Sequence, residues 1–211
     1  MLPPDARRAT VASMKLYDVA ASPNCRKVRV IARELGLQLE LLPIDFKTAK
    51  EPAYLAQNPA GKVPTLVDDD GFVLWESGAI LIYLAEKKPS SGLLPFEAHA
   101  RADVMRWLLF TATHVQPWVS LLGQERIIKA RTGAAPEPAL IALAERELAR
   151  FLPVMNAQLA RSPYLNGSYT IADIAAGCGL ENCEARGINL APYPELSAWR
   201  ERLRQRPAWH D

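Results

Sequence analysis

The stretch that decides the fold is Asn58–Leu66, with the sequence NPAGKVPTL, which runs from a turn into a short β-prone segment. A proline at the entry of a strand is typical of a sheet edge or a turn, because it cannot donate to the ladder. If the Val63-Pro64 bond is cis, the Val63 backbone is exposed and can pair with an extended peptide. Taken alone, the stretch is explained better by an ordinary loop. The neighbouring segments must therefore decide between a loop and a site that pairs with a peptide.

Strand and helix patterns alternate on both sides of this stretch. Residues 15–19 and 39–44 are expected to be strands, separated by an apolar repeat at helical spacing. Residues 65–67 and 72–75 flank an Asp-Gly turn, which is a hairpin signal. A β-α-β unit forces a parallel pair through its right-handed crossover, and the hairpin adds an antiparallel edge. Residues 14–88 are therefore predicted to form a small mixed sheet covered by helices.

Strand patterns disappear after a linker rich in proline, serine and glycine at residues 89–97. Helices are expected over 98–131 with a bend at Pro117, over 137–161 with a kink at Pro153, over 171–186 and over 195–206. The predicted fold class is α/β plus all-α, with a helical bundle at residues 98–211. Residues 1–13 lack the apolar stretch of a signal peptide and are expected to be a flexible leader.

Charge and composition disfavour several classes of protein. The chain has 25 Lys and Arg against 23 Asp and Glu, a net charge of +2, whereas nucleic-acid binding normally needs a concentrated basic face. No segment approaches the roughly 18 consecutive apolar residues of a membrane span. The three cysteines make no disulfide framework, and Cys178 and Cys183 have no histidine beside them. No metal site is therefore expected, and a reducing, cytoplasmic compartment is predicted.

A second motif, Ser22-Pro23-Asn24-Cys25-Arg26-Lys27-Val28, follows the first expected strand. Ser22 is a good N-cap and Pro23 suits the first helical position, so the motif can simply begin a helix. It can also bind an anion, because a helix N-terminus presents free N–H groups and partial positive charge. A hydroxyl there would favour the thiolate of a bound thiol, whose pKa can fall from ~8.5 to roughly 3.5–7.5 in such a place.

The strand-to-helix turn at Glu76-Ser77 allows the same two interpretations. In the first, Ser77 is only the N-cap of the next helix. In the second, the Ser77 hydroxyl and the helix amides hold a carboxylate, while an amine lies near Glu76.

Together, in this order and at this spacing, the three motifs resemble the cytosolic glutathione transferase superfamily, in its bacterial form with serine and asparagine at the first helix. The similarity extends from about Lys15 to the C-terminus, and the helical half adds the capping-box pattern of Thr170 and Asp173. The resemblance implies a thioredoxin-like N-terminal domain that binds glutathione, followed by an all-helical domain. It also implies a homodimer.

The resemblance further implies candidate site residues. Ser22 matches the catalytic hydroxyl of the serine-type classes, and Asn24 matches an asparagine that contacts the glutathione sulfur in some bacterial classes. Cys25 competes for that contact, although it can instead face the sheet as a small apolar core residue. The residues that match the rest of the glutathione site are Asn58 and Lys62 near the glycyl end, Val63 and Pro64 at the cysteinyl unit, and Glu76 and Ser77 at the γ-glutamyl end.

The implied function is conjugation of glutathione, the cosubstrate, to a small and mostly apolar electrophile held between the domains. Glutathione-dependent reduction of disulfides or peroxides is the alternative. A non-catalytic binding protein is disfavoured because it has no need of a peptide clamp, and an isomerase because that class typically has Ser-Ser-Cys at this helix. The residues available on the long helix to wall the second pocket are Met105, Trp107, Phe110, Thr111, His114 and Trp118.

Overall fold

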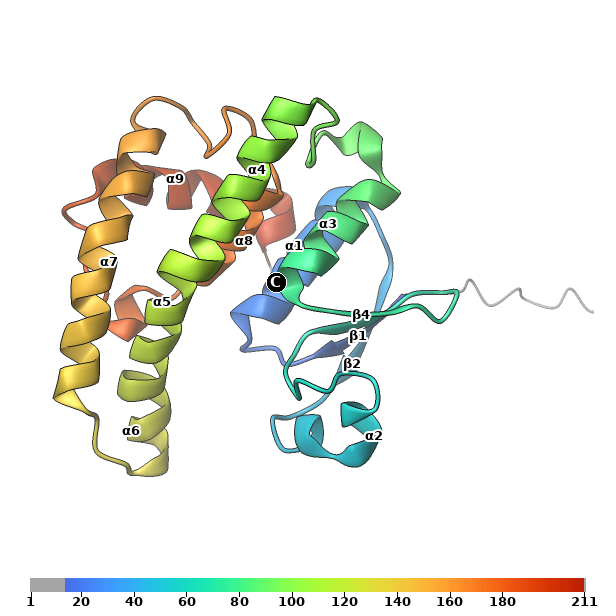
Figure 1. The fold of residues 1–211 in the computed structure, drawn as a ribbon, viewed down its shortest axis with the longest axis horizontal. Helices are drawn as coiled ribbons and strands as arrows, with labels where there is room; N and C mark the ends of the chain where they lie inside the picture. Colours follow the sequence, from blue (N-terminus) through green and yellow to red (C-terminus); the bar gives the residue numbers. More distant parts are fainter. Residues whose placement is uncertain (1–13, 211) are drawn as a thin grey trace, which may run out of the picture.

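The computed structural model describes residues 14–210, in which a four-stranded sheet lies beside a layer of helices (Figure 1). The strand order is β2-β1-β3-β4. Strand β1 (Met14–Asp18) pairs in parallel with β2 (Leu39–Pro43) and antiparallel with β3 (Thr65–Val67), which pairs antiparallel with β4 (Val73–Trp75). The predicted mixed sheet is confirmed. The predicted leader and the last residue lie outside the described residues.

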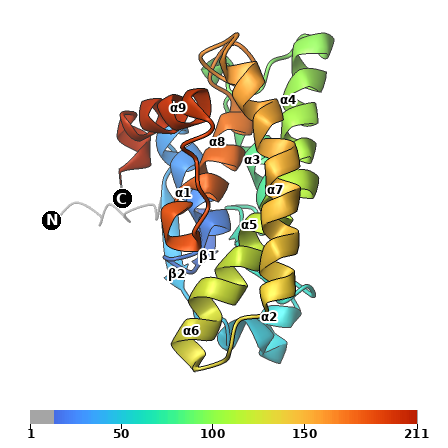
Figure 2. The same ribbon diagram turned by 90° about the vertical axis from the view of Figure 1, so that its left-hand side faces the viewer.

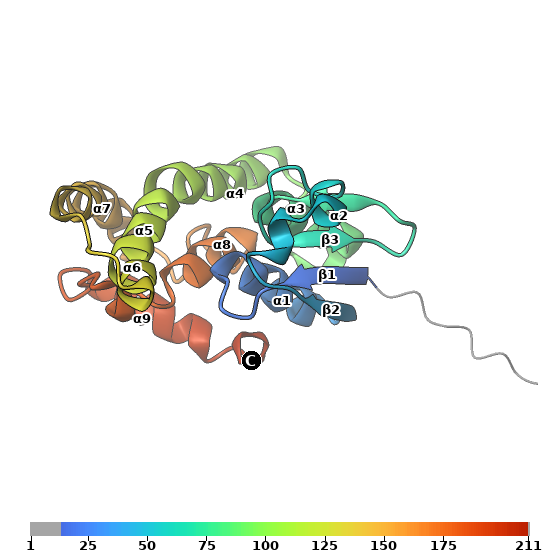
Figure 3. The ribbon, with the colours of Figure 1, turned by 90° about the horizontal axis from the view of Figure 1, so that it is seen from below.

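Helices α1 (Pro23–Leu35) and α3 (Ser77–Lys87) pack side by side on one face of the sheet, and the short α2 (Pro52–Leu55) lies on the other (Figures 1 and 3). The N-cap of α1 is Ser22, whose side chain accepts a hydrogen bond from a backbone N–H of the first turn. The helix ends at Gly36, whose φ of 65° is left-handed and favours glycine.

The helical half contains α4 (Ala98–Phe110), α5 (Gln116–Gly123), α6 (Lys129–Thr132), α7 (Pro138–Leu159), α8 (Ile171–Leu180) and α9 (Pro194–Arg204). Within residues 14–210, no helix is both long and apolar enough to cross a membrane. The prediction of a helix over 171–186 is wrong at its end. Helix α8 stops at Leu180, and the chain turns before a separate 3₁₀ turn at Glu184–Arg186.

The long helix predicted over 98–131 contains two π-helical turns, Thr111–Val115 and Gln124–Ile128, which separate α4, α5 and α6. The first of them ends two residues before Pro117, which has no backbone N–H to donate. A π turn widens the helix at a place where its regular hydrogen bonds are interrupted. The disturbance predicted at Pro117 therefore takes the form of a π turn inside a continuous helical segment.

The segment that joins the two halves is packed against the protein. Leu93 and Leu94 are 5% and 4% exposed, and the Leu93 carbonyl accepts a hydrogen bond from the N–H of Ile171 at 3.0 Å. A single hydrophobic cluster extends from Leu16 in the sheet to Trp199 in α9. The two predicted domains therefore share one core.

Helix α8 occupies the centre of the helical half, between α1 and the long helix (Figure 3), and all 10 of its residues are buried. The Asp173 carboxylate accepts hydrogen bonds from the N–H of Thr170 at 3.0 Å, the N–H of Leu165 at 3.0 Å and the indole N–H of Trp199 at 2.9 Å. The predicted capping box of Thr170 and Asp173 is confirmed. Because Asp173 also binds α9, the cap joins two helices as well as starting one.

The end of the described chain returns to α1, as Figure 2 shows. The guanidinium of Arg26 donates to the Trp209 carbonyl at 2.7 Å. Arg206 donates two hydrogen bonds to the Glu34 carboxylate, at 2.8 and 2.9 Å. The 3₁₀ turn Pro207–Trp209 is thereby held against the first helix.

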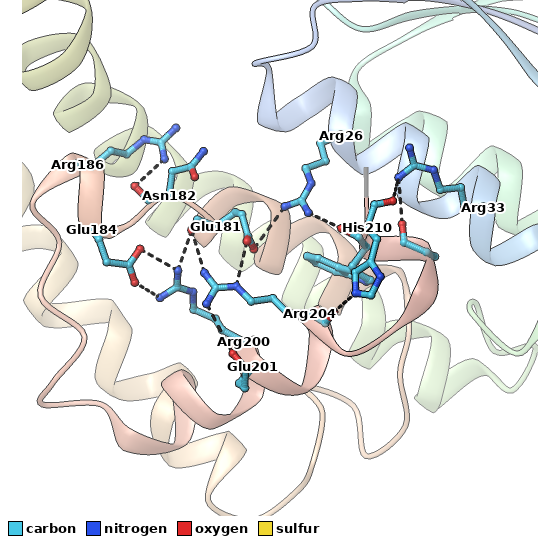
Figure 4. A network of polar contacts seen from close by, with 12 residues as sticks. Arg26, Arg33, Glu181, Asn182, Glu184, Arg186, Arg200, Glu201, Arg204 and His210 are labelled. Carbon is cyan, nitrogen blue, oxygen red and sulfur yellow. Dashed lines mark hydrogen bonds and ion pairs between the residues drawn. The ribbon is translucent and has the colours of Figure 1, made fainter.

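A polar network joins α1, α8 and α9 (Figure 4). Glu181, directly after α8, pairs with Arg26 of α1 at 3.4 Å and with Arg204 of α9 at 3.0 Å. Arg200 donates to the Glu184 carboxylate at 2.9 Å and to the Glu181 carbonyl at 2.8 Å. These contacts fix α9 against the pair formed by α1 and α8.

Candidate active site

The sheet register brings the three sequence motifs together. Thr65 at the start of β3 pairs with Tyr17 near the end of β1 and with Trp75 at the end of β4. The turn that precedes β3 and the turns that follow β1 and β4 therefore lie at the same end of the sheet. The candidate residues of all three motifs belong to these turns.

Ser22 lies at the N-terminus of α1, and within residues 14–210 its hydroxyl donates to no other group. Its Oγ accepts the N–H of Cys25 at 3.4 Å, and its own backbone N–H donates to the Val19 carbonyl at 2.8 Å. A hydroxyl has one hydrogen to donate besides its acceptor lone pairs, so these contacts leave that hydrogen free for a ligand. Ser22 also lines a cavity of about 280 Å³, together with Arg26 and Asn182.

Asn24 connects the first motif to the third. Its Oδ1 accepts hydrogen bonds from the Ser77 hydroxyl at 3.4 Å and from Lys27 Nζ at 2.8 Å. The candidate for the sulfur contact and the candidate for the γ-glutamyl end, which come from motifs far apart in the sequence, therefore touch each other.

Cys25 faces away from this surface. It is fully buried and packs with Ala49, Tyr54 and Val63. Its Sγ accepts a hydrogen bond from the N–H of Val19 at 3.5 Å. Burial raises the pKa of the Cys25 thiol to about 11, so the thiol is protonated at neutral pH. The geometry agrees with the interpretation of Cys25 as a core residue and not with a sulfur contact.

The bond between Val63 and Pro64 is cis. Neither the backbone N–H nor the carbonyl of Val63 is hydrogen-bonded to another residue of the range 14–210. Both groups are therefore available to an extended ligand.

Asn58 lies behind this loop. It is 1% exposed, and its amide nitrogen donates to the Lys62 carbonyl at 2.8 Å and to Thr65 Oγ1 at 3.0 Å. The hydroxyl of Tyr54 donates to the same carbonyl at 2.5 Å. Asn58 and Tyr54 thus support the loop from within, which corrects the expectation that Asn58 lies at the ligand surface. The Lys62 side chain is exposed.

Glu76 has an unusual backbone conformation, with φ 73° and ψ 110°, and no other non-glycine residue in the described part of the chain has a positive φ. Such a conformation is strained for a residue that has a Cβ. It turns the chain directly into α3, whose first amides donate no hydrogen bond to a capping side chain. Those amides and the Ser77 hydroxyl are placed to hold a carboxylate, with the exposed Glu76 carboxylate beside them.

The candidate pocket residues of the long helix do not all face in the same direction. Trp107 and Thr111 are buried, whereas Phe110 and His114 face α7, where the His114 ring stacks on Phe151 with centroids 4.8 Å apart. Trp107 and Phe110 line a cavity of about 480 Å³ between α4 and α7. It shares no lining residue with the cavity beside Ser22. The expectation that the long helix walls the second pocket stays a prediction, and of its six available residues Trp107 and Phe110 line this cavity.

A group of carboxylates in the hairpin, Asp68–Asp70, has oxygen atoms within 4.8 Å of one another. Asp68 accepts hydrogen bonds from the Tyr83 hydroxyl and the Lys87 ammonium. Burial raises the pKa of Asp68, but these two donors outweigh it and hold the pKa at about 2. The group lies at the opposite end of β3 from the three motifs, and its buried member is already paired with a cation.

Comparison with known proteins identifies the family of this fold and site. Residues 16–92 match the N-terminal domain of glutathione S-transferases, and residues 111–207 match their C-terminal domain. The chain is 38% identical over 207 residues to glutathione S-transferase 3 of Zea mays, covering 94% of this chain and 92% of that protein. It is 36% identical over 201 residues to the disulfide-bond oxidoreductase YfcG of Escherichia coli strain K12, covering 90% and 89%.

A solved structure of a glutathione S-transferase from Pseudomonas fluorescens is similar throughout, with a TM-score of 0.84 and 34% identity over 92% of this chain and 96% of that chain. The chain belongs to the cytosolic glutathione S-transferase superfamily and has both of its domains. The predicted fold class, a thioredoxin-like domain followed by an all-helical domain, is confirmed. The relatives support glutathione as the ligand of the site.

Proposed function

We propose that this protein conjugates the glutathione thiolate to a small and mostly apolar electrophile. The observation that carries the proposal is the position of Ser22, whose free hydroxyl hydrogen lies at the N-terminus of α1 beside a cavity. A thiolate there receives a hydrogen bond and the partial positive charge of the helix. Each pKa unit by which the thiol is lowered corresponds to ~1.36 kcal/mol of preference for the thiolate.

Glutathione lies across the three turns in this proposal. The Ser77 hydroxyl and the first amides of α3 hold the γ-glutamyl carboxylate, and Glu76 pairs with the γ-glutamyl amine. The backbone of Val63 pairs with the cysteinyl unit as a single residue of added strand. Lys62 reaches the glycyl carboxylate, and Asn58 supports the loop that carries Lys62. Ser22 and Asn24 donate to the sulfur.

Reduction of disulfides is a second candidate function, and the similarity to the oxidoreductase YfcG favours it. In this reaction the bound thiolate attacks one sulfur of a disulfide and expels the other as a thiolate. A second glutathione thiolate then attacks the glutathione sulfur of the mixed disulfide, which forms oxidised glutathione and expels the remaining substrate sulfur as a thiolate. The second thiol comes from glutathione because Cys25 is buried and protonated.

We also propose that the protein is a homodimer. Phe72 and Trp75 beside β4 are 47% and 38% exposed, and Leu109 on α4 is 64% exposed. Large apolar side chains gathered on a surface mark interaction sites. Sedimentation at micromolar concentration tests this, and a purely monomeric species would contradict it.

The three free cysteines fit a reducing compartment, so the cytoplasm stays our proposed location.

The deciding experiment compares two assays on the purified protein with glutathione. One follows conjugation of a chlorodinitrobenzene-type electrophile, and the other follows reduction of a small mixed disulfide. Strong conjugation that is lost in Ser22→Ala supports the proposal. Strong reduction with weak conjugation contradicts it in favour of the reductase, and makes Asn24 the next residue to replace.

A further inference from the structure

Lys27 is a residue of the site that the sequence motifs do not explain. It lies in the first turns of α1 and is only 7% exposed, one turn before the buried Ile31. A lysine is rarely buried to this extent unless its ammonium group has partners. Burial lowers the pKa of Lys27, while the nearby Glu76 opposes that effect and favours the charged form.

The hydrogen-bond partner of Lys27 is Asn24. Lys27 Nζ donates to Asn24 Oδ1 at 2.8 Å, and the Ser77 hydroxyl donates to the same oxygen at 3.4 Å. An ammonium group has no acceptor, so only the oxygen of the Asn24 amide can face it. The nitrogen of the same planar amide group therefore points away from Lys27. Within the described residues its two N–H groups have no acceptor.

The groups around Lys27 leave the start of α1 positively charged. Glu76, from the turn before α3, is exposed to solvent, which screens its charge. Cys178, from α8, is neutral at physiological pH because burial raises the pKa of its thiol to about 12. Arg26 of α1 is a further cation near Cys178, but it is paired with Glu181 at 3.4 Å and adds little net charge. An anion bound at the N-terminus of α1 is therefore favoured by the Lys27 ammonium as well as by the helix.

We propose that Lys27 is a positioning residue, which holds Asn24 with its amide N–H groups toward the glutathione sulfur and thereby stabilises the thiolate. The proposal rests on the proposed contact between Asn24 and the sulfur. Lys27 itself does not touch glutathione in this arrangement. In the proposed complex the single hydrogen of the Ser77 hydroxyl is donated to the γ-glutamyl carboxylate, so Lys27 is then the donor that holds Asn24 Oδ1. Without the ammonium group, the amide of Asn24 can turn its oxygen toward the sulfur, where it would repel the thiolate.

The test is an ultraviolet titration of the glutathione thiol bound to the wild type, to Lys27→Met, to Asn24→Ala and to the double variant. We expect Lys27→Met to raise the pKa of the bound thiol by about one unit, because a nearby opposite charge shifts a pKa by roughly 1–3 units directly and by less through an intervening residue. In the Asn24→Ala background the same substitution is expected to have less than about half of that effect, since residues that act together are not additive.

Lys15→Met is the matched control, because the Lys15 side chain is 51% exposed on β1 and the variant should leave the thiol titration unchanged. If Lys27→Met does not fold, Lys27→Leu, whose side chain also has no hydrogen-bond donor, provides the same test. A purely structural role for Lys27 would change the unfolding temperature and leave the pKa of the bound thiol in place.

An unchanged thiol pKa in a folded Lys27 variant would overturn the inference. An equal shift with and without Asn24 would also overturn it, because Lys27 would then act on the sulfur by another route. A wild-type protein whose bound thiol titrates at the ~8.5 of a free thiol would remove the proposed function as well. The wild-type titration therefore separates failure of this inference from failure of the function.

Discussion

Ser77 is expected to carry a large share of the affinity for glutathione. Ser77 is 9% exposed at the first position of α3, and its hydroxyl already has a polar neighbour in Asn24. Ser77→Ala should weaken glutathione binding by about 1.5–3 kcal/mol, the range for a hydrogen bond to a charged group. Calorimetry measures this, with Ser120→Ala on the exposed face of α5 as the control. Equal affinities of the two variants would contradict the proposed role.

The backbone strain at Glu76 lowers the stability of the folded protein. A residue held at φ 73° is strained by about 1–3 kcal/mol, whereas glycine adopts this conformation freely. We expect Glu76→Gly to raise the free energy of unfolding by about 1 kcal/mol, after subtraction of the added chain entropy of glycine, and to weaken glutathione binding.

Glu76→Ala is the matched variant, because alanine lacks the carboxylate but keeps the strain. It should lose affinity to the same extent without the gain in stability. Urea denaturation of both apo proteins measures the difference. Equal free energies of unfolding for the two variants would show that the backbone at this position is not strained.

The sequence motifs predict which turns form the site, but not the direction of every side chain in them. Asn24 and Ser77 are in contact, whereas Asn58 is buried behind its loop. Lys27 lies within the first motif, but the motif assigns it no role. Which side chains are buried depends on how α1 packs against α3 and α8, and that packing involves residues distant in the sequence. Local patterns contain no information about such contacts.

Among the elements, α8 packs unusually closely against its neighbours. A Cβ on Gly177 would lie 2.4 Å from Leu203 Cδ1 and 2.5 Å from Trp209 Cη2. We expect Gly177→Ala to destabilise the protein by about 1–3 kcal/mol, the usual effect of overpacking, in spite of the better helix propensity of alanine.

Gly78 in α3 provides the opposite case, since a Cβ there meets no atom within 4 Å. Gly78→Ala should therefore stabilise the apo protein by up to about 1 kcal/mol. Denaturant unfolding of both variants measures the two effects: the free energy of unfolding should fall in Gly177→Ala and rise in Gly78→Ala. A gain in stability at Gly177 as well would mean that α8 and α9 are packed less closely than described.

Element types were predictable and their ends less so. The change between strand-like and helix-like spacing of the apolar residues located the sheet, the hairpin and the helices, because these patterns involve only residues close in the sequence. The end of α8 at Leu180 was not predictable, since an apolar pattern continues beyond it to Cys183. The same holds for the second π turn, Gln124–Ile128, which has no proline beside it and for which we have no local cause.

At the scale of the whole molecule, the contact between Arg206 and Glu34 connects the end of the described chain to α1. Arg206 makes two hydrogen bonds to Glu34, and its guanidinium lies 3.6 Å from the centroid of the Tyr169 ring. Arg206→Ala is expected to lower the free energy of unfolding by about 1–2 kcal/mol, because it removes a bidentate pair together with a cation–π contact.

Arg146→Ala is the control for this substitution. The Arg146 side chain is 68% exposed where it pairs with Glu147, so its loss should change stability by less than about 1 kcal/mol. Thermal and denaturant unfolding measure both variants. Equal losses would show that the Arg206 contact is no stronger than an ordinary surface pair.

The buried thiols predict how the whole molecule responds to alkali. Burial raises the pKa of Cys25 from 9.0 to about 11 and that of Cys178 from 9.0 to about 12. A thiol with a raised pKa in the folded state holds its proton more tightly there, so its contribution to stability is complete below pH 9 and is lost as the pH rises toward 11 and 12. The free energy of unfolding should fall over this interval.

Cys178→Ala removes one of these titrating groups and should make the decline between pH 9 and 12 less steep. Urea midpoints measured across the interval test this. A decline of the same steepness in the variant would assign the alkaline sensitivity to other groups.

The π turn at Thr111–Val115 is a place where the long helix can change its length. Such a turn holds one residue more than an α-helical turn, so deleting a single residue there restores regular geometry. The residues after it, from Gln116 onward, would then keep their orientation around the helix axis, because the wide turn already absorbs the extra residue. A deletion in a regular α-helical turn would instead rotate everything after it by about 100°. The π turn is therefore the place where this helix can lose a residue and still present the same side chains to the thioredoxin-like half.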